Sequence, residues 1–320
     1  MCSALKLFKR LLLASGFLAQ TSLAALAPGN YEFALPYQSL QRSYLVHVPP
    51  KAADSRRLPV VLSFHGGGSN AEVMRSYTRM DRAADRDGYI AVYPNGSSGI
   101  GGRFLTWNAG SCCGPAAALQ IDDVGFSLAV LDDLAARASI DTARIYATGL
   151  SNGSMMAYRL AAEASERIAA VAGVAGAMSL TRFAPKLPVP VMHIHSKEDH
   201  IARYDGGFGP PSTLIDTRMF NASVEEMLRK WLDFDGCPLR PAVVDPVAGE
   251  QGTPDEDQSA IRREYRPCRA GVEVVLWQLS GAGHVWPGGV RDYNTQLLGT
   301  GTAVIDANAE MWRFFSRFKR

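Results

Sequence analysis

A serine between two glycines is the first residue of the chain that could do chemistry. Gly149-Leu150-Ser151-Asn152-Gly153 follows an apolar run that ends at Thr148, and a helical pattern begins at Asn152. A strand, tight turn and helix in this order raise a serine hydroxyl above the end of a sheet, and small flanking residues let the turn pack closely. The pattern predicts that Ser151 is the nucleophile of an acyl-transfer reaction, the alternative being an idle serine in a glycine-rich turn.

A second glycine-rich motif, His65-Gly66-Gly67-Gly68, follows another apolar run that ends at Phe64. Residues without side chains allow backbone N–H groups to approach a substrate oxygen that becomes negatively charged during the reaction. We expect Gly67 or Gly68 to supply one such N–H, and Asn152, next to the nucleophile, to supply the other. His65 itself is interpreted as a residue that orders this loop.

A serine nucleophile requires a general base, and the chain contains six histidines. His284 stands alone in the glycine-rich loop 281–289, directly after the last predicted strand. From there its side chain can reach over the carboxyl edge of a parallel sheet. His47, His193 and His195 lie instead in predicted strands, so His284 is the expected base.

The carboxylate that orients this base should follow a strand between Ser151 and His284. Asp199 comes shortly after such a strand and gives the order serine, aspartate, histidine that the α/β-hydrolase fold requires. Glu198 and Asp205 are nearby alternatives for the same role.

These motifs need a sheet whose strands end on one side. Apolar or alternating runs predict strands near residues 31–35, 42–48, 58–64, 88–93, 144–148, 168–174, 189–195 and 272–279. Apolar residues at helical spacing predict helices near residues 73–84, 123–135, 152–163, 224–231 and 305–312, with Asp123 as a helix N-cap. This alternation is typical of an α/β fold, a mostly parallel central sheet with helices on both faces. The acidic stretch 241–260 is predicted to be a surface insertion.

The first 24 residues have the features of a secretory signal peptide. Three basic residues precede an apolar run at 11–18, and Ser22-Leu23-Ala24 matches a small-x-small cleavage signal. That run is too short to span about 30 Å of hydrocarbon. We therefore expect cleavage after Ala24, export to the periplasm or the extracellular space, and a single catalytic domain over residues 25–320.

Composition excludes several functional classes. The chain has 320 residues, of which 47% are hydrophobic and 20% charged, a balance typical of globular proteins. Its net charge is +2 and no basic run gathers that charge, so we expect no nucleic-acid partner. No segment after the leader offers about 18 consecutive apolar residues, so we expect no membrane contact. The sequence indicates no obligate protein partner.

Four cysteines follow the predicted leader, and an even number in an oxidising compartment favours disulfides. Cys237 and Cys268 are the preferred pair because each lies beside a turn that flanks a polar segment. Cys112 and Cys113 are then either a vicinal disulfide or two thiols, and the other pairings stay open. Their spacing does not match that of metal ligands, so we expect no metal site.

In this order the motifs resemble a family of secreted esterases that includes polyhydroxybutyrate-depolymerase-like and feruloyl-esterase-like enzymes. The resemblance extends from about residue 31 to residue 320. It is carried by HGGG at 65–68, Trp107 with the cysteine cluster at 112–114, the segments 122–126 and 149–153, His-x-His at 193–195 with Asp199, and GAGHVWPGG at 281–289. The resemblance implies a triad of Ser151, Asp199 and His284 that needs neither a metal nor an organic cofactor.

The sequence thus predicts a serine esterase that acts on small or oligomeric esters through an acyl-enzyme. Short-chain or oligomeric hydroxyalkanoate esters are the first candidates, and feruloyl or acetyl esters of plant polysaccharides are the alternative. A ligand-binding protein that kept the fold and lost the chemistry is the non-enzymatic alternative. Trp107, Trp286, Tyr204 and Phe208 fall in loops at the expected sheet edge. There they either line an acyl or aromatic pocket or pack within the loops, and the sequence leaves both alternatives open.

Overall fold

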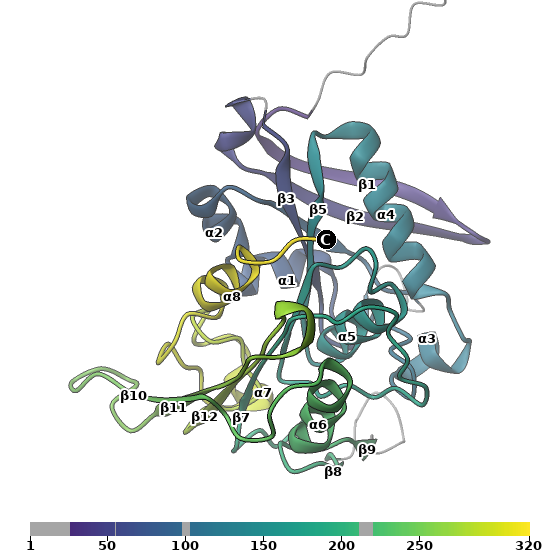
Figure 1. Cartoon of the computed structure of the whole chain (residues 1–320). Coiled ribbons are helices and arrows are strands. Elements are labelled where there is room, and N and C mark those ends of the chain that lie inside the picture. The colour runs from purple at the N-terminus through teal and green to yellow at the C-terminus, as the bar shows by residue number, and fades with distance from the viewer. Residues whose placement is uncertain (1–25, 55, 98–102, 211–219) are drawn as a thin grey trace, which may run out of the picture.

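A computed structural model describes residues 26–54, 56–97, 103–210 and 220–320, so the predicted signal peptide up to Ala24 lies outside the described residues (Figure 1). The strands are β1 (Gly29–Tyr37), β2 (Leu40–Val48), β3 (Leu58–Phe64), β4 (Ile90–Pro94), β5 (Ile140–Leu150), β6 (Ala170–Val174), β7 (Val191–Ser196), β8 (Gly207–Phe208), β9 (Phe220–Asn221), β10 (Val243–Ala248), β11 (Ser259–Tyr265) and β12 (Val274–Ser280). Ten of them form one sheet in the order β1-β2-β4-β3-β5-β6-β7-β12-β11-β10, and β8 pairs with β9.

The centre of the large sheet is parallel and its edges are antiparallel. Strands β4, β3, β5, β6, β7 and β12 pair in parallel. Strands β2 and β1 extend one edge in antiparallel pairing, and β11 and β10 extend the other. Every residue of β3 is buried, whereas β1 alternates between half-buried and exposed positions, as expected for a central and an edge strand. The predicted α/β-hydrolase fold class is confirmed.

Helices cover both faces of this sheet. They are α1 (Ala71–Thr78), α2 (Met80–Asp87), α3 (Gly114–Ala118), α4 (Asp123–Arg137), α5 (Asn152–Glu163), α6 (Val224–Asp235), α7 (Thr295–Leu298) and α8 (Ala307–Phe315), with 3-10 turns at Pro50–Asp54 and Arg269–Gly271. Apolar side chains of α4, α5 and α6 join one hydrophobic cluster, and those of α1, α2 and α8 join another. Figure 1 shows these two groups of helices on opposite sides of the sheet.

Two details of the predicted helices are wrong. The single helix expected at 73–84 is broken at Arg79, which adopts a left-handed conformation with φ of 54° between α1 and α2. The N-cap of α4 is Asp122, whose side chain accepts the N–H of Gly125. Asp123 is instead fully buried and forms an ion pair with Arg42, 2.7 Å between Oδ1 and Nη2.

The predicted surface insertion at 241–260 lies mostly at the surface, where it contains β10 and leads into β11. The residues of β10 are exposed or half-buried at the edge of the sheet, and a proline interrupts the strand at Pro246. A strand with a neighbour on one side needs few apolar residues, and proline is tolerated at sheet edges. The polar composition therefore reflects an edge strand rather than a loop.

The structure joins Cys237 to Cys268, as preferred from the sequence, and this disulfide ties the end of α6 to the segment before β12. The question left open for Cys112 and Cys113 is answered by a vicinal disulfide between them, across a cis peptide bond. Within the described ranges, none of the helices is both long and apolar enough to cross a membrane.

Candidate active site

The turn between β5 and α5 holds Ser151 in an unusual backbone conformation, with φ of 57° and ψ of −122°. A Cβ on Gly149 would lie 2.4 Å from the carbonyl carbon of Gly153, and a Cβ on Gly153 would lie 2.1 Å from the carbonyl oxygen of Phe64. Both distances exclude a side chain. The flanking glycines are therefore required for the close packing that holds the serine in this turn.

The glycine-rich loop after β3 lies against this turn. A Cβ on Gly67 would lie 3.5 Å from the Cβ of Asn152, and one on Gly66 would lie 3.7 Å from the Cβ of Ser151. The N–H of Gly68 is already donated to the carbonyl oxygen of Leu105, at 2.9 Å. No such acceptor takes the N–H of Gly67 or Asn152 within the described residues, so these two amides are available to a substrate oxygen.

His65 fastens this loop through both ring nitrogens. Its Nε2 accepts the N–H of Gly96 at 2.9 Å, and its Nδ1 donates to the carbonyl oxygen of Gly66 at 2.8 Å. Complete burial lowers the pKa of His65 to about 4, so the ring is neutral at physiological pH. These contacts agree with the interpretation of His65 as a loop-ordering residue.

Trp107 is hydrogen-bonded to the turn that carries the proposed nucleophile. The side-chain amide of Asn152 accepts the backbone N–H of Trp107 at 2.8 Å and donates to its carbonyl oxygen at 3.1 Å. The indole N–H donates to the carbonyl oxygen of His65 at 2.9 Å, and the whole side chain is inaccessible to solvent. Trp107 therefore positions the backbone around the site, which agrees with the alternative of an aromatic residue that packs within the loops.

The other candidate pocket residues differ in their burial. Trp286 and Tyr204 are each 2% exposed, and the Tyr204 hydroxyl is hydrogen-bonded to Glu225 and Gln278. Both side chains are therefore buried, which agrees with the alternative of aromatic residues that pack within the loops. Phe208 is 59% exposed and remains accessible from solvent.

The predicted base and acid are hydrogen-bonded to each other. His284 Nδ1 lies 2.7 Å from Asp199 Oδ2, and each residue is 3% exposed. The other carboxylate oxygen, Oδ1, accepts the backbone N–H groups of Ile201 and Ala202, both at 2.9 Å. Burial alone would raise the pKa of Asp199, but its charge interaction with His284 and the hydrogen bonds from both histidines that face it hold that pKa below its ordinary value. Asp199 is therefore ionised.

The two alternative carboxylates are engaged elsewhere. Glu198 Oε2 accepts the N–H of Gly281 at 2.9 Å, which anchors the loop that carries His284. Asp205 is exposed and pairs with Lys197 at 2.9 Å. Of the three carboxylates considered, Asp199 is the one that contacts His284.

The elements bring these groups to one edge of the sheet. Gly67 follows β3, Ser151 follows β5, Asp199 follows β7 and His284 follows β12. Strands β3, β5, β6, β7 and β12 are consecutive and parallel, so their carboxyl ends meet at the same edge. This arrangement can support nucleophilic attack, proton transfer and stabilisation of an oxyanion.

Sequence reasoning gave no role to His195, although it contacts the same carboxylate. Its Nε2 lies 3.2 Å from Asp199 Oδ2. The available signal was a His-x-His pair inside an otherwise apolar strand, because a buried polar side chain must find a partner. Across the part of the chain that the structure describes, no cluster of three or more His, Cys, Asp or Glu residues could hold a metal ion.

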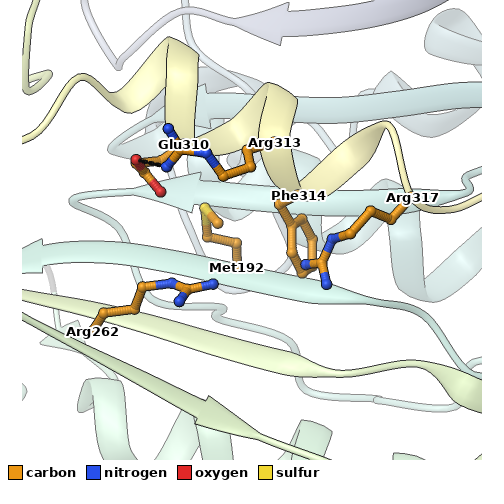
Figure 2. Close-up of a pocket in the computed structure, with 6 residues that line it drawn as sticks. All are labelled: Met192, Arg262, Glu310, Arg313, Phe314 and Arg317. Atoms are coloured by element: carbon orange, nitrogen blue, oxygen red, sulfur yellow. Dashed lines mark hydrogen bonds and ion pairs between the residues drawn. The ribbon is translucent and has the colours of Figure 1, made fainter. Parts of the chain in front are cut away.

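The structure also contains a cavity of about 190 Å³ (Figure 2). It is lined by Met192, Arg262, Glu310, Arg313, Phe314 and Arg317. Met192 is near the start of β7, at the opposite end of that strand from Asp199. Each arginine has a carboxylate partner, in the pairs Arg313–Glu310, Arg317–Glu273 and Arg262–Glu264. The cavity therefore offers neither a nucleophile nor a free cation to an ester.

Comparisons with known proteins identify relatives among esterases. The family model described as "Esterase PHB depolymerase" matches residues 42–212. The chain is 32% identical over 275 residues to "Putative esterase NocK" from Nocardia uniformis subsp. tsuyamanensis, covering 81% of this chain and 74% of that protein. It is 26% identical over 253 residues to "Feruloyl esterase B" from Piromyces equi, covering 76% of this chain and 42% of that protein. The chain thus spans less than half the length of the second relative.

Among solved structures, the acetyl xylan esterase from Aspergillus awamori resembles the chain with a TM-score of 0.52. The two share 12% sequence identity, and the match covers 90% of this chain and 99% of that structure. At this level of identity the likeness supports the fold, and the chemistry must be inferred from the site.

Proposed function

Because the chain belongs to the esterase PHB depolymerase family, we propose that it is a serine esterase that hydrolyses carboxylic ester bonds of small or oligomeric substrates. The hydrogen bond between His284 and Asp199, at the sheet edge where Ser151 directly precedes α5, is the observation that carries this proposal. Acyl transfer requires a serine and a histidine that a carboxylate orients, and the position of all three after parallel strands at one sheet edge supports this role.

In the first half of the reaction, Ser151 Oγ attacks the ester carbonyl carbon while His284 Nε2 accepts the hydroxyl proton. Asp199 accepts the Nδ1–H of His284 and stabilises the imidazolium that forms. The carbonyl oxygen becomes negatively charged and accepts the amide N–H groups of Gly67 and Asn152. The bond to the alcohol oxygen then breaks, His284 returns the proton to that oxygen, and an acyl-enzyme remains.

In the second half, water attacks the carbonyl carbon of the acyl-enzyme and gives a proton to His284. The same two amides stabilise the oxyanion. When the bond to Ser151 breaks, His284 protonates the serine oxygen, and the free carboxylic acid leaves. The cycle returns Ser151 and His284 to their starting protonation states, and it needs no cofactor.

For the substrate, we propose short-chain or oligomeric hydroxyalkanoate esters. Trp107, Trp286 and Tyr204 are buried and engaged in packing, which argues against a preformed slot for a planar feruloyl group. Feruloyl or acetyl esters of plant polysaccharides are the second candidate, supported by the relative named "Feruloyl esterase B".

Activity of the purified mature chain on a panel of soluble esters tests both parts of the proposal. The panel holds p-nitrophenyl acetate and butyrate, a hydroxybutyrate trimer methyl ester, methyl ferulate and acetylated xylo-oligosaccharide. We expect turnover of the butyrate and the trimer ester, and labelling of Ser151 by a fluorophosphonate probe that Ser151→Ala abolishes. Labelling at another residue, or no turnover of any ester, would contradict the mechanism; a preference for methyl ferulate would select the second candidate.

We also propose that the chain is exported. The cleavage signal ending at Ala24 and the disulfide between Cys237 and Cys268 both suit an oxidising compartment outside the cytoplasm. Sequencing the N-terminus of the protein recovered outside the cytoplasm should start at Ala25. Recovery of the chain only in the cytoplasm with Met1 retained would contradict export.

A further inference from the structure

A line of buried polar side chains lies behind the carboxylate proposed to orient the base. Tyr158, on α5, has its hydroxyl 2.9 Å from His193 Nδ1 and 3.1 Å from the carbonyl oxygen of Met192. His193 Nε2 lies 2.9 Å from His195 Nδ1, both on β7. His195 Nε2 in turn lies 2.7 Å from the carbonyl oxygen of Ala202 and 3.2 Å from Asp199 Oδ2. The exposed fractions of Tyr158, His193 and His195 are at most 1%.

The chemistry of the last contact determines where the protons lie. A carbonyl oxygen and an ionised carboxylate can only accept hydrogen bonds, so His195 Nε2 must carry a hydrogen. In a neutral His195 ring, Nδ1 is then bare and accepts the Nε2–H of His193. Complete burial lowers the pKa of His193 well below its ordinary value, so His193 is neutral. Its Nε2–H is donated to His195, so its bare Nδ1 accepts the Tyr158 hydroxyl, the shorter of the two contacts of that hydroxyl. Every donor in the line therefore points toward Asp199.

We propose that His195 is a positioning residue for the reaction proposed above. It donates its Nε2–H to Asp199 and so keeps that carboxylate aligned with His284, while Tyr158 and His193 hold His195 in the required tautomer. The inference rests on the proposed function, because His195 has a positioning role only if Asp199 orients His284 for catalysis.

Geometry explains why one more donor matters at this carboxylate. Both backbone N–H donors, from Ile201 and Ala202, contact Oδ1. They therefore restrain rotation of the carboxylate about its Cβ–Cγ bond through that one oxygen. Oδ2 receives His284 at 2.7 Å and His195 at 3.2 Å from two different elements. Without His195, Oδ2 would keep His284 as its one side-chain donor. His284 would then be held less firmly over the nucleophile.

A simpler role for His195 would be to fasten the turn after β7 through Ala202. Two substitutions separate the two roles, because glutamine can place an N–H near the position of histidine Nε2 and leucine cannot. We expect His195→Leu to lower kcat on p-nitrophenyl butyrate by about tenfold while KM changes less than about twofold, since the lost hydrogen bond is to a charged group. We expect His195→Gln to restore most of that loss.

The pH profile gives a readout that loosened packing alone would not move. The titratable side chains that contact His195 or Asp199 among the described residues are His284, His193 and Tyr204. Removing a donor from Asp199 leaves more negative charge facing His284 and favours the protonated base. The acidic limb of kcat/KM in His195→Leu should therefore move to higher pH, and in His195→Gln it should stay near the wild-type position.

A milder pair of variants covers the case in which His195→Leu does not fold. Tyr158→Phe removes the first donor of the line, and Tyr146→Phe removes the hydroxyl of an equally buried tyrosine that donates to Phe318, away from Asp199. We expect Tyr158→Phe to lower kcat about threefold and Tyr146→Phe to leave it unchanged, a difference of the size that one neutral hydrogen bond gives. Equal kcat in the two variants would overturn the proposal.

Histidine ¹⁵N NMR on the labelled full chain reads the tautomers directly. Nε2–H forms of His195 and His193 are expected, and a bare Nε2 on His195 would overturn the proposal. The same would follow if folded His195→Leu kept the wild-type kcat and pH profile, or if His195→Gln lost as much as His195→Leu. Failure of the proposed function is distinguishable, because wild-type protein would then neither turn over esters nor be labelled at Ser151.

Discussion

At the scale of single residues, the proposed chemistry depends on a hydrogen bond that water hardly reaches. Asp199 and His284 are each 3% exposed, and the low local dielectric strengthens the attraction between the carboxylate and a protonated imidazole. Ser151 is partly accessible, as a nucleophile must be. The acid and base are thus shielded, while the attacking atom can meet a substrate.

Substitutions in this group should abolish turnover without unfolding the chain. We expect Ser151→Ala and His284→Ala each to lower kcat on p-nitrophenyl butyrate by about 10⁴-fold or more, because the members of a triad act as a unit. Asp199→Asn should cost about 10⁴-fold, since an amide favours the wrong tautomer of the base. Circular dichroism and thermal unfolding check that the variants are folded.

Matched controls exist for two of these changes. His200→Ala removes an exposed histidine one residue after Asp199, and Asp205→Asn changes an exposed carboxylate of the same loop. Both should keep kcat near the wild-type value. A large loss in Asp205→Asn with little loss in Asp199→Asn would transfer the role of the acid to Asp205.

His65 should make stability depend on pH. Its pKa is about 4 in the folded chain, below the ordinary value of about 6.5, so the folded state favours the neutral ring. The stabilisation is therefore complete above about pH 6.5 and is lost as the pH falls toward 4. We expect roughly 2 kcal/mol less free energy of unfolding at pH 5 than at pH 8 from this group.

Urea unfolding at the two pH values measures this effect, and His65→Gln is the matched variant. The glutamine side-chain oxygen can accept the N–H of Gly96 but cannot titrate. The difference in unfolding free energy between pH 8 and pH 5 should thus be smaller in His65→Gln than in wild type. An unchanged difference would contradict a neutral, buried His65.

Most candidate residues were recognisable from the sequence because their types and positions are restrictive. A serine in a tight glycine turn after a buried strand, and a lone histidine in a glycine-rich loop, occur together in few kinds of protein. For the contact between His195 and Asp199, the His-x-His pair indicated a buried partner but not which one, because the turn after β7 brings the carboxylate back to the ring. The burial of Trp107 was equally hidden, since a tryptophan in a loop can pack inward or line a pocket.

At the scale of elements, a disulfide connects the end of α6, the helix that follows Asp199, to the segment before β12, the strand that precedes His284. Cys237 lies just after α6, and Cys268 lies before β12, whose following loop carries His284. Replacing both cysteines with alanine should lower the free energy of unfolding by about 3–4 kcal/mol, because the bridge closes a loop of 32 residues in the unfolded chain. Urea unfolding at pH 7 checks this.

The same double variant should keep kcat within about twofold at 25 °C, since neither cysteine contacts the proposed triad and the sheet edge is held by strand pairing. Serine at both positions is the matched control for side-chain size. A wild-type free energy of unfolding in both double variants would show that the bridge is absent from the purified protein or contributes nothing to stability.

The central strands could be predicted from the sequence, whereas the edge strand β10 could not. Strands such as β3 are buried on both faces and must be apolar throughout, which leaves a clear pattern. Strand β10 lies at an edge and satisfies its backbone through β11, so its residues can be polar and resemble a loop. The break at Arg79 has no comparable signal, because the residues on either side keep helical spacing.

At the scale of the whole molecule, large apolar side chains remain exposed in the segments that follow the carboxyl ends of central strands. Phe104 follows β4, Phe208 follows β7, and Tyr293 and Leu297 follow β12. Phe208 contacts Phe220 on β9, with ring centroids 5.4 Å apart, and both are more than half exposed. An ester that approaches Ser151 arrives at the edge from which these loops extend.

This distribution predicts that apolar, oligomeric esters bind better than small ones. In the double variant Phe208→Ser and Phe220→Ser, KM for a hydroxybutyrate trimer methyl ester should rise about fivefold or more, because partial burial of an aromatic ring contributes about 1 kcal/mol. Values of kcat/KM for p-nitrophenyl acetate should stay near wild type, since acetate is too small to reach these rings. Leu187→Ser is the matched control, because Leu187 is 41% exposed but precedes β7 at the opposite end of the sheet. If the double variant and this control raise the trimer KM equally, or if acetate is affected as much as the trimer, then substrate binding does not use the two phenylalanines.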